Sequence, residues 1–264
     1  LDHRQDRNIK MIESLERAGI KNYERVRGML PSEWPEKAQQ MTAMLRRPQV
    51  GAIGCYLSQE SIVKKALELN KHAFVMEDDL QFCSDFEKRI EYIDKWIGRG
   101  SGYDFLGQPV VDDREWDIIW LGGTFHVGGK GPYWHTHTLG RDAECTDDPR
   151  MMRTYGSFCT YAYIVNRRSI EKVLFLLDQF LSQSIGIDHS MINISPQLKT
   201  YAFVPGCVIQ YDNLSDQIPS KQHITNFSGF SRLNGTEENS KYWFQDKMEM
   251  FDPLAFDWAE AKVK

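Results

Sequence analysis

A short apolar run that ends in three carboxylates constrains the fold of this chain more than any other feature. Residues 72–76 read His-Ala-Phe-Val-Met and lead directly into Glu77, Asp78 and Asp79. A continuous apolar run of this length is typical of a strand covered on both faces. A helical pattern over residues 51–70 comes before it. The order of helix, buried strand and acidic end predicts an α/β domain with carboxylates at the carboxyl end of a sheet, where ligands bind in open α/β folds.

The rest of the chain repeats this alternation of helices and short strands. Apolar periodicity and Gly/Pro punctuation predict further helices at residues 4–18, 36–45, 84–97, 167–181 and 187–194. They predict further strands at residues 23–27, 116–121, 157–165, 201–204 and 207–210. Residues 124–155 are rich in Gly, His, Pro and Asp, which is typical of a long functional loop. We expect one domain over residues 1–264, with a mostly parallel central sheet flanked by helices, a core of about residues 1–218 and a wrapping tail at 219–264.

Composition limits the partners and the compartment. The 264 residues carry a formal net charge of −5 without a long basic run, which argues against nucleic acid as a partner. No stretch approaches the roughly 18 apolar residues of a membrane span. The five cysteines are odd in number and contain no C-x-x-C pair, so we expect free thiols and a cytoplasmic location. Four Asn-x-Ser/Thr triplets leave the lumen of the secretory pathway as the alternative.

The acidic triplet has the chemistry of a metal site. Side chains two apart on an extended segment point the same way, so Glu77 and Asp79 can share one ion while Asp78 faces elsewhere. Hard cations such as Mn²⁺ or Mg²⁺ prefer oxygen ligands and often bridge one or two carboxylates to substrate phosphates. A solvated acidic loop or a helix cap before Leu80 is the alternative interpretation of the same residues.

Two more residues are candidates for the site. Asp188 stands at the start of a predicted short helix, where an Asp is most often an N-cap; the functional alternative is a general base. His223, late in the chain, is a candidate for a terminal metal ligand.

Four blocks, taken in order, resemble glycosyltransferase family 25, the group of bacterial lipooligosaccharide transferases and collagen galactosyltransferases. The opening residues 1–7 are similar to the family's N-L-x-x-R-x-D-R start, with the first strand and its Asn expected upstream of Leu1. Residues 51–58 are similar to its G-x-x-G-C-x-L-S-H block, residues 74–79 to its L-V-x-E-D-D block, and residues 117–122 to its D-x-I-x-L-G block. Gln59 stands where the family usually has His.

The resemblance implies a fold and a reaction. It implies a GT-A type nucleotide-diphospho-sugar transferase fold and an inverting, metal-dependent transfer from a UDP-sugar to a hydroxyl of a glycan or glycoprotein acceptor. UDP-galactose is the family's usual donor, with UDP-glucose or UDP-xylose as alternatives. It assigns the metal (Mn²⁺ or Mg²⁺) to Glu77 and Asp79, and makes Asp188 the catalytic base. The donor-binding positions it implies are Arg4, Arg7, Gly54, Ser58 and Asp78.

Two other functions remain open from the residues alone. The acids could hold two metals in a hydrolase or phosphotransferase, which would require further carboxylates such as Asp117 or Asp188 at strand ends. The chain could also be a non-catalytic sugar-binding domain, which predicts loss of the acidic motif. That motif is intact here.

Overall fold

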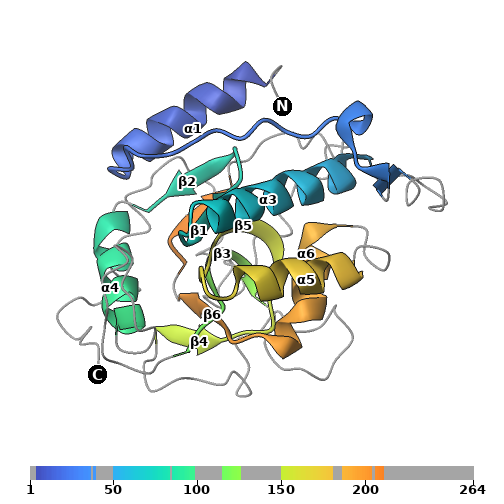
Figure 1. The fold of residues 1–264 in the computed structure, drawn as a ribbon. Helices are drawn as coiled ribbons and strands as arrows, with labels where there is room; N and C mark the ends of the chain where they lie inside the picture. The colour runs from blue at the N-terminus through green and yellow to red at the C-terminus, as the bar shows by residue number, and fades with distance from the viewer. Residues whose placement is uncertain are drawn as a thin grey trace, which may run out of the picture.

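A computed structural model describes residues 4–36, 38–39, 50–83, 85–98, 115–125, 150–180, 186–203 and 206–210. Within them, helices lie on both faces of a central sheet (Figure 1). The helices are α1 (Gln5–Arg17), η1 (Pro31–Glu33), α3 (Val50–Glu68), α4 (Phe86–Gly98), α5 (Ile170–Phe180), α6 (Ile187–Ile194) and η2 (Ser195–Gln197). The strands are β1 (Ala73–Met76), β2 (Leu80–Phe82), β3 (Ile118–Phe125), β4 (Met151–Arg153), β5 (Ser157–Val165), β6 (Thr200–Phe203) and β7 (Val208–Gln210).

The central sheet is mixed, in the order β1-β5-β3-β6-β4. Strand β5 runs antiparallel to both β1 and β3, while β3 and β6 are parallel and β4 is antiparallel to β6. The prediction of an α/β fold is confirmed, but the prediction of a mostly parallel sheet is wrong. An apolar run reports that a strand is covered on both faces and not which way it runs, so β5 could not be distinguished from a parallel strand.

Alternate side chains of the same strands enter two separate cores. Val75, Trp120 and Tyr163 pack toward α3, α5 and α6, whereas Ile119, Leu121 and Ile164 pack toward α1, α4 and β2. This alternation is the period-2 pattern of a strand with an apolar layer on each side. Because both faces of the sheet are covered, a site is expected at the ends of the strands. Tyr161 of β5 adds an aromatic side chain to the second of these cores.

A small ribbon made by β2 and β7 packs beside the central sheet. The two strands pair antiparallel, and the Cys207 N–H donates to the Leu121 carbonyl of β3 at 2.6 Å. The approach is close at Gly122, because a Cβ there would lie 2.5 Å from Val208 Cγ2. Since β1 pairs with β5 and β2 pairs with β7, both ends of the acidic triplet are held by strands.

Most predicted elements are present. Helix 187–194 and strand 157–165 are confirmed to the residue, and the other predicted helices within the described residues agree to within about three residues at each end. Residues 23–27 form no strand, so that prediction is wrong; Glu24 and Arg27 there pair with Lys65 and Glu33 instead of building a ladder.

The expected long loop is shorter than predicted, because β3 extends to Phe125 and β4 covers residues 151–153. The three-residue strands β2 and β4 carry too few side chains to show a period, and the sequence did not predict them. Most of the predicted helix 36–45, the remainder of the loop and the tail 219–264 lie outside the described residues.

Candidate active site

The acidic triplet lies at the carboxyl end of β1, as the sequence predicts. The Glu77 N–H donates to the Tyr161 carbonyl at 3.0 Å, which extends the β1–β5 ladder by one residue. Asp79 is buried, Glu77 is partly buried and Asp78 is exposed. The alternation places Glu77 and Asp79 inward and Asp78 outward, the arrangement expected for an extended segment.

Glu77 is held by a buried polar network. Its Oε1 accepts a hydrogen bond from Thr160 Oγ1 at 2.7 Å and a longer one from Gln59 Nε2 at 3.3 Å. Burial, and then the negative charge of Asp79, raise the pKa of Glu77 to about 8; the Thr160 hydrogen bond acts in the opposite direction. Glu77 therefore keeps its proton more readily than an ordinary carboxyl group, and a positive charge close to it would favour the ionised form.

Arg7 brings one positive charge from α1 to the triplet. Its Nη1 lies 3.1 Å from Asp78 Oδ1 and 3.2 Å from Asp79 Oδ2. Arg4 lies one turn earlier and forms two hydrogen bonds with Asp6, at 2.9 and 3.0 Å. Of the two arginines proposed for the nucleotide, the structure therefore brings Arg7 into contact with the acids and pairs Arg4 with its own helix.

Asp188 is the second residue of α6, not its N-cap. Gly186 occupies the N-cap position, so the interpretation of Asp188 as a capping residue is wrong. Asp188 Oδ1 accepts a hydrogen bond from the His189 N–H at 2.8 Å and lies 3.1 Å from His189 Nδ1. Burial raises the pKa of Asp188, but the interactions with His189 outweigh it and the net shift is downward. Asp188 is therefore a carboxylate at neutral pH.

Asp188 and the triplet share one electrostatic environment. The charge of Asp188 contributes to raising the pKa of Glu77, and both acids contribute to raising the pKa of the Cys159 thiol to about 12, after burial as the main cause. The two ends of the predicted site, which are 111 positions apart in the sequence (188 minus 77), therefore lie close to each other.

An irregularity in β5 connects these two ends. Cys159 has a φ of 62°, in the left-handed region that residues other than glycine rarely adopt. It lies where the β3–β5 register shifts, near Gly123. The Cys159 N–H donates to Asp188, and the next residue, Thr160, donates to Glu77. No signal in the sequence marks Cys159 or Thr160, because neither residue type favours a bulge.

Gly54 and Ser58 make their contacts within the protein. Ser58 Oγ donates to the Gly54 carbonyl at 2.6 Å and accepts from the Met29 N–H at 2.9 Å. A Cβ on Gly54 would lie 3.1 Å from the Met29 carbonyl oxygen. These contacts hold the segment after α1 against α3, which is a structural role for two positions predicted to bind the donor.

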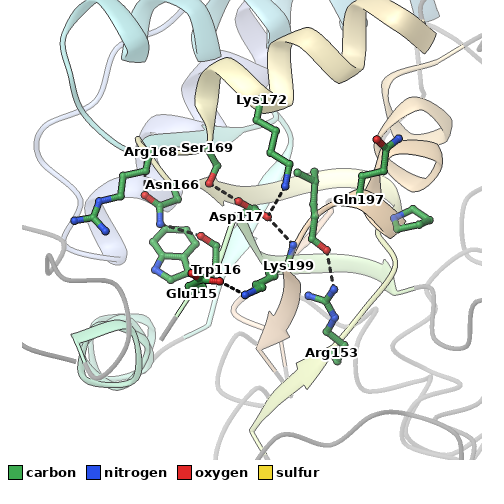
Figure 2. Close-up of a pocket in the computed structure, with 12 residues that line it drawn as sticks. Glu115, Trp116, Asp117, Arg153, Asn166, Arg168, Ser169, Lys172, Gln197 and Lys199 are labelled. Carbon is green, nitrogen blue, oxygen red and sulfur yellow. Dashed lines mark hydrogen bonds and ion pairs between the residues drawn. The ribbon is translucent and has the colours of Figure 1, made fainter. Parts of the chain in front are cut away.

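Asp117 lies at the opposite end of the strands from the triplet. It precedes β3, whose first residue pairs with Val165 at the end of β5. It accepts hydrogen bonds from Ser169 Oγ and from the Lys199 N–H, the latter at 2.6 Å, and lies 3.7 Å from Lys172 Nζ. Figure 2 shows these groups around Asp117 in a cavity of about 500 Å³. Asp117 is thus separated from the triplet and cannot supply the extra ligand that a two-metal hydrolase requires.

The described residues fit a cation bound by few protein ligands. No group of three or more His, Cys, Asp or Glu residues lies close enough to hold a metal in the part of the chain that the structure describes. Glu77 and Asp79 form an inward pair of acids whose repulsion a cation would relieve. Two carboxylates suffice for Mg²⁺ or Mn²⁺ when substrate phosphates and water complete the shell. His223, the third proposed ligand, lies outside the described residues.

Comparison with known protein families gives a match to the first part of the chain. The sequence profile of glycosyltransferase family 25 (LPS biosynthesis protein) matches residues 1–116. The match covers α1, α3, β1, the acidic triplet, β2 and α4. No curated protein sequence matches the chain significantly. Among the described residues, no helix is both long and apolar enough to cross a membrane.

Proposed function

We propose that this chain transfers a sugar from a UDP-sugar to a hydroxyl of a glycan or glycoprotein acceptor. The premise is that the chain belongs to glycosyltransferase family 25 through residues 1–116 and is therefore a transferase. The reaction centre is the edge of the sheet where Glu77, Asp78 and Asp79 meet Asp188. The observation that carries this proposal is the clustering of these acids around the irregularity in β5. UDP-galactose is the donor we expect first, with UDP-glucose and UDP-xylose as alternatives.

The family implies a GT-A type fold, and the architecture of the described residues agrees with it. Strands β1, β3 and β6 run in one direction, with β5 inserted between β1 and β3 in the opposite direction. Helices cover both faces, and the acids follow the carboxyl end of β1. That position is where ligands bind in open α/β sheets.

The donor's diphosphate lies over the triplet in this proposal. Glu77 and Asp79 would hold a Mn²⁺ or Mg²⁺ ion, which would supply the positive charge that the diphosphate of the leaving UDP needs. Arg7 holds Asp78 and Asp79 in place from α1, and its guanidinium suits phosphate oxygens as well as carboxylates. The triplet therefore combines a binding site for a cation with a fixed positive charge beside it.

Asp188 takes the proton of the acceptor hydroxyl. Its lowered pKa keeps it ionised, and its Oδ1 is oriented by the hydrogen bond from the His189 N–H. The hydroxyl oxygen attacks the anomeric carbon from the side opposite the diphosphate, so the C–O bond to UDP breaks as the new C–O bond forms. One in-line displacement inverts the anomeric configuration and requires no covalent enzyme intermediate. The proton ends on Asp188.

A screen of UDP-sugars tests this function. Purified protein with Mn²⁺ is incubated with UDP-galactose, UDP-glucose, UDP-xylose and UDP-N-acetylglucosamine, and UDP release is measured. We expect slow release from one donor without an acceptor, because water can replace the acceptor hydroxyl. Asp188→Asn should keep UDP binding and lose transfer by about 100-fold or more, the range for loss of a general base. Failure of every donor, or full activity of Asp188→Asn, would overturn the assignment.

A further inference from the structure

Gln59 of α3 contacts Glu77 from the interior of the protein. Its Nε2 donates to Thr160 Oγ1 at 2.8 Å and to Glu77 Oε1 at 3.3 Å. Its side chain is buried, with 5% exposed, as are Thr160 with 2% and Tyr163 with 1%. Such a network is expensive to bury unless its members satisfy one another, so its geometry is strongly determined.

Tyr163 of β5 determines which way the Gln59 amide points. The Tyr163 hydroxyl donates to Gln59 Oε1 at 2.9 Å, and this contact leaves the NH₂ group to face Thr160 and Glu77. When Glu77 is ionised, the reverse orientation would bring the amide oxygen against its carboxylate, with no proton between the two acceptors. The chain Tyr163, Gln59, Glu77 therefore runs donor to acceptor in one direction.

The network engages only one oxygen of Glu77. Both hydrogen bonds, from Thr160 and from Gln59, go to Oε1. Oε2 accepts no hydrogen bond from the residues that the structure describes, and Glu77 is not fully buried. The hydrogen bonds from Thr160 and Gln59 to Oε1 restrict rotation of the carboxylate and keep Oε2 available as a ligand atom.

The neutrality of Gln59 matters as much as its geometry. An imidazole at this position could become protonated and neutralise Glu77 from within the protein. An amide offers the same kind of N–H donor without a full charge, so the negative charge of an ionised Glu77 remains to be balanced by an external cation.

We propose that Gln59, oriented by Tyr163, is the positioning residue that presents the Glu77 carboxylate to a divalent cation. This inference rests on the proposed function. Gln59 does not touch substrate or metal; it acts through Glu77, in the way that hydrogen-bond partners of metal ligands orient them.

The test measures Mn²⁺ binding directly. Free Mn²⁺ is followed by electron paramagnetic resonance during titration of the protein with UDP present, alongside thermal unfolding by circular dichroism. Gln59→Leu, which keeps the bulk and removes the amide, should weaken Mn²⁺ binding about 10–100-fold, the range for loss of such a partner. Gln59→His restores a donor that can also become charged, so it should bind Mn²⁺ more tightly than Gln59→Leu and less tightly than wild type. The Mn²⁺ concentration for half-maximal activity should be lowest for wild type, higher for Gln59→His and highest for Gln59→Leu.

Two tyrosines provide a second variant and its control. Tyr163→Phe removes only the hydroxyl that orients Gln59, and it should weaken Mn²⁺ binding even if Gln59→Leu does not fold. Tyr56→Phe removes another buried hydroxyl, which donates to the Leu177 carbonyl at 2.9 Å and lies one turn from Gln59 on α3. It should lower stability and leave Mn²⁺ affinity unchanged.

The outcomes separate this inference from the proposed function. If wild-type protein binds Mn²⁺ and releases UDP while folded Gln59→Leu and Tyr163→Phe bind Mn²⁺ equally well, Gln59 does not position Glu77 and the transferase assignment stands. If the wild-type protein with UDP does not bind Mn²⁺, the metal-dependent function fails and this inference fails with it.

Discussion

Cys159 shows, at the scale of a single residue, how strain can serve a site. A left-handed backbone costs a residue with a side chain roughly 1–2 kcal/mol. The same conformation directs the Cys159 N–H to Asp188 and the following Thr160 side chain to Glu77. Strained residues persist where the surrounding contacts determine them, and such residues often cluster at functional sites.

Substitutions at Cys159 should therefore follow backbone preference and not side-chain volume. Cys159→Gly fits a φ of 62° without strain and should stay within about 1 kcal/mol of wild type. Cys159→Val fills more space but should destabilise by about 1–3 kcal/mol, since β-branched residues disfavour this region strongly. Urea unfolding of both variants measures the difference. A valine variant as stable as the glycine variant would show that the left-handed backbone is not required.

At the scale of the helices and strands, the position of an acid relative to a strand determines its role. Glu77 follows the carboxyl end of β1, and Asp117 precedes the amino end of β3. Because β1 and β3 both run antiparallel to β5, they run in the same direction. Glu77 and Asp117 therefore lie at opposite ends of the strands. Asp117 joins β3 to α5 and to the start of β6 through Ser169 and Lys199.

Asp117→Asn should separate stability from ligand binding. The amide keeps the shape but loses the charge that favours the Ser169 hydroxyl, the Lys199 N–H and Lys172, and hydrogen bonds to charged groups contribute about 1.5–3 kcal/mol each. We expect a loss of about 2 kcal/mol in urea unfolding, with Mn²⁺-dependent UDP binding unchanged in the folded protein. Loss of UDP binding at unchanged stability would place Asp117 in the active site instead.

The sequence predicted elements better than it predicted their pairing. Apolar period and length were sufficient for α6 and β5, whose bounds agree to the residue. They could not give the direction of β5, since a strand covered on both faces looks the same either way. The β2 and β4 strands depend on partners far away in the chain, β7 and β6, and carry no local signal of their own.

The site was predictable only where chemistry shows in the residue type. Three adjacent carboxylates mark the triplet, and its place after β1 follows from the apolar run. Gln59 was visible as a departure from the family's usual His, but its contact with Glu77 depends on the packing of α3 against β5. The contact between Cys159 and Asp188 depends on a bulge, which no local residue preference announces.

At the scale of the whole molecule, two apolar cores leave the acids at an edge. One core lies under α3, α5 and α6, and the other under α1, α4 and the β2–β7 ribbon (Figure 1). The triplet lies between β1 and β2, so it is anchored to both the central sheet and the ribbon. Around the triplet, this end of the sheet brings together Arg7 of α1, Thr160 of β5 and Asp188 of α6.

Metal-dependent binding of UDP tests the central claim most directly. Isothermal titration of UDP is performed with Mn²⁺ and with excess chelator on wild-type protein and on Asp79→Asn, with Asp117→Asn as the control at the opposite edge. We predict that wild-type protein and Asp117→Asn bind UDP only with Mn²⁺, and that Asp79→Asn does not bind. Equal binding of UDP in chelator, or wild-type affinity in Asp79→Asn, would contradict a metal-dependent site at the end of β1.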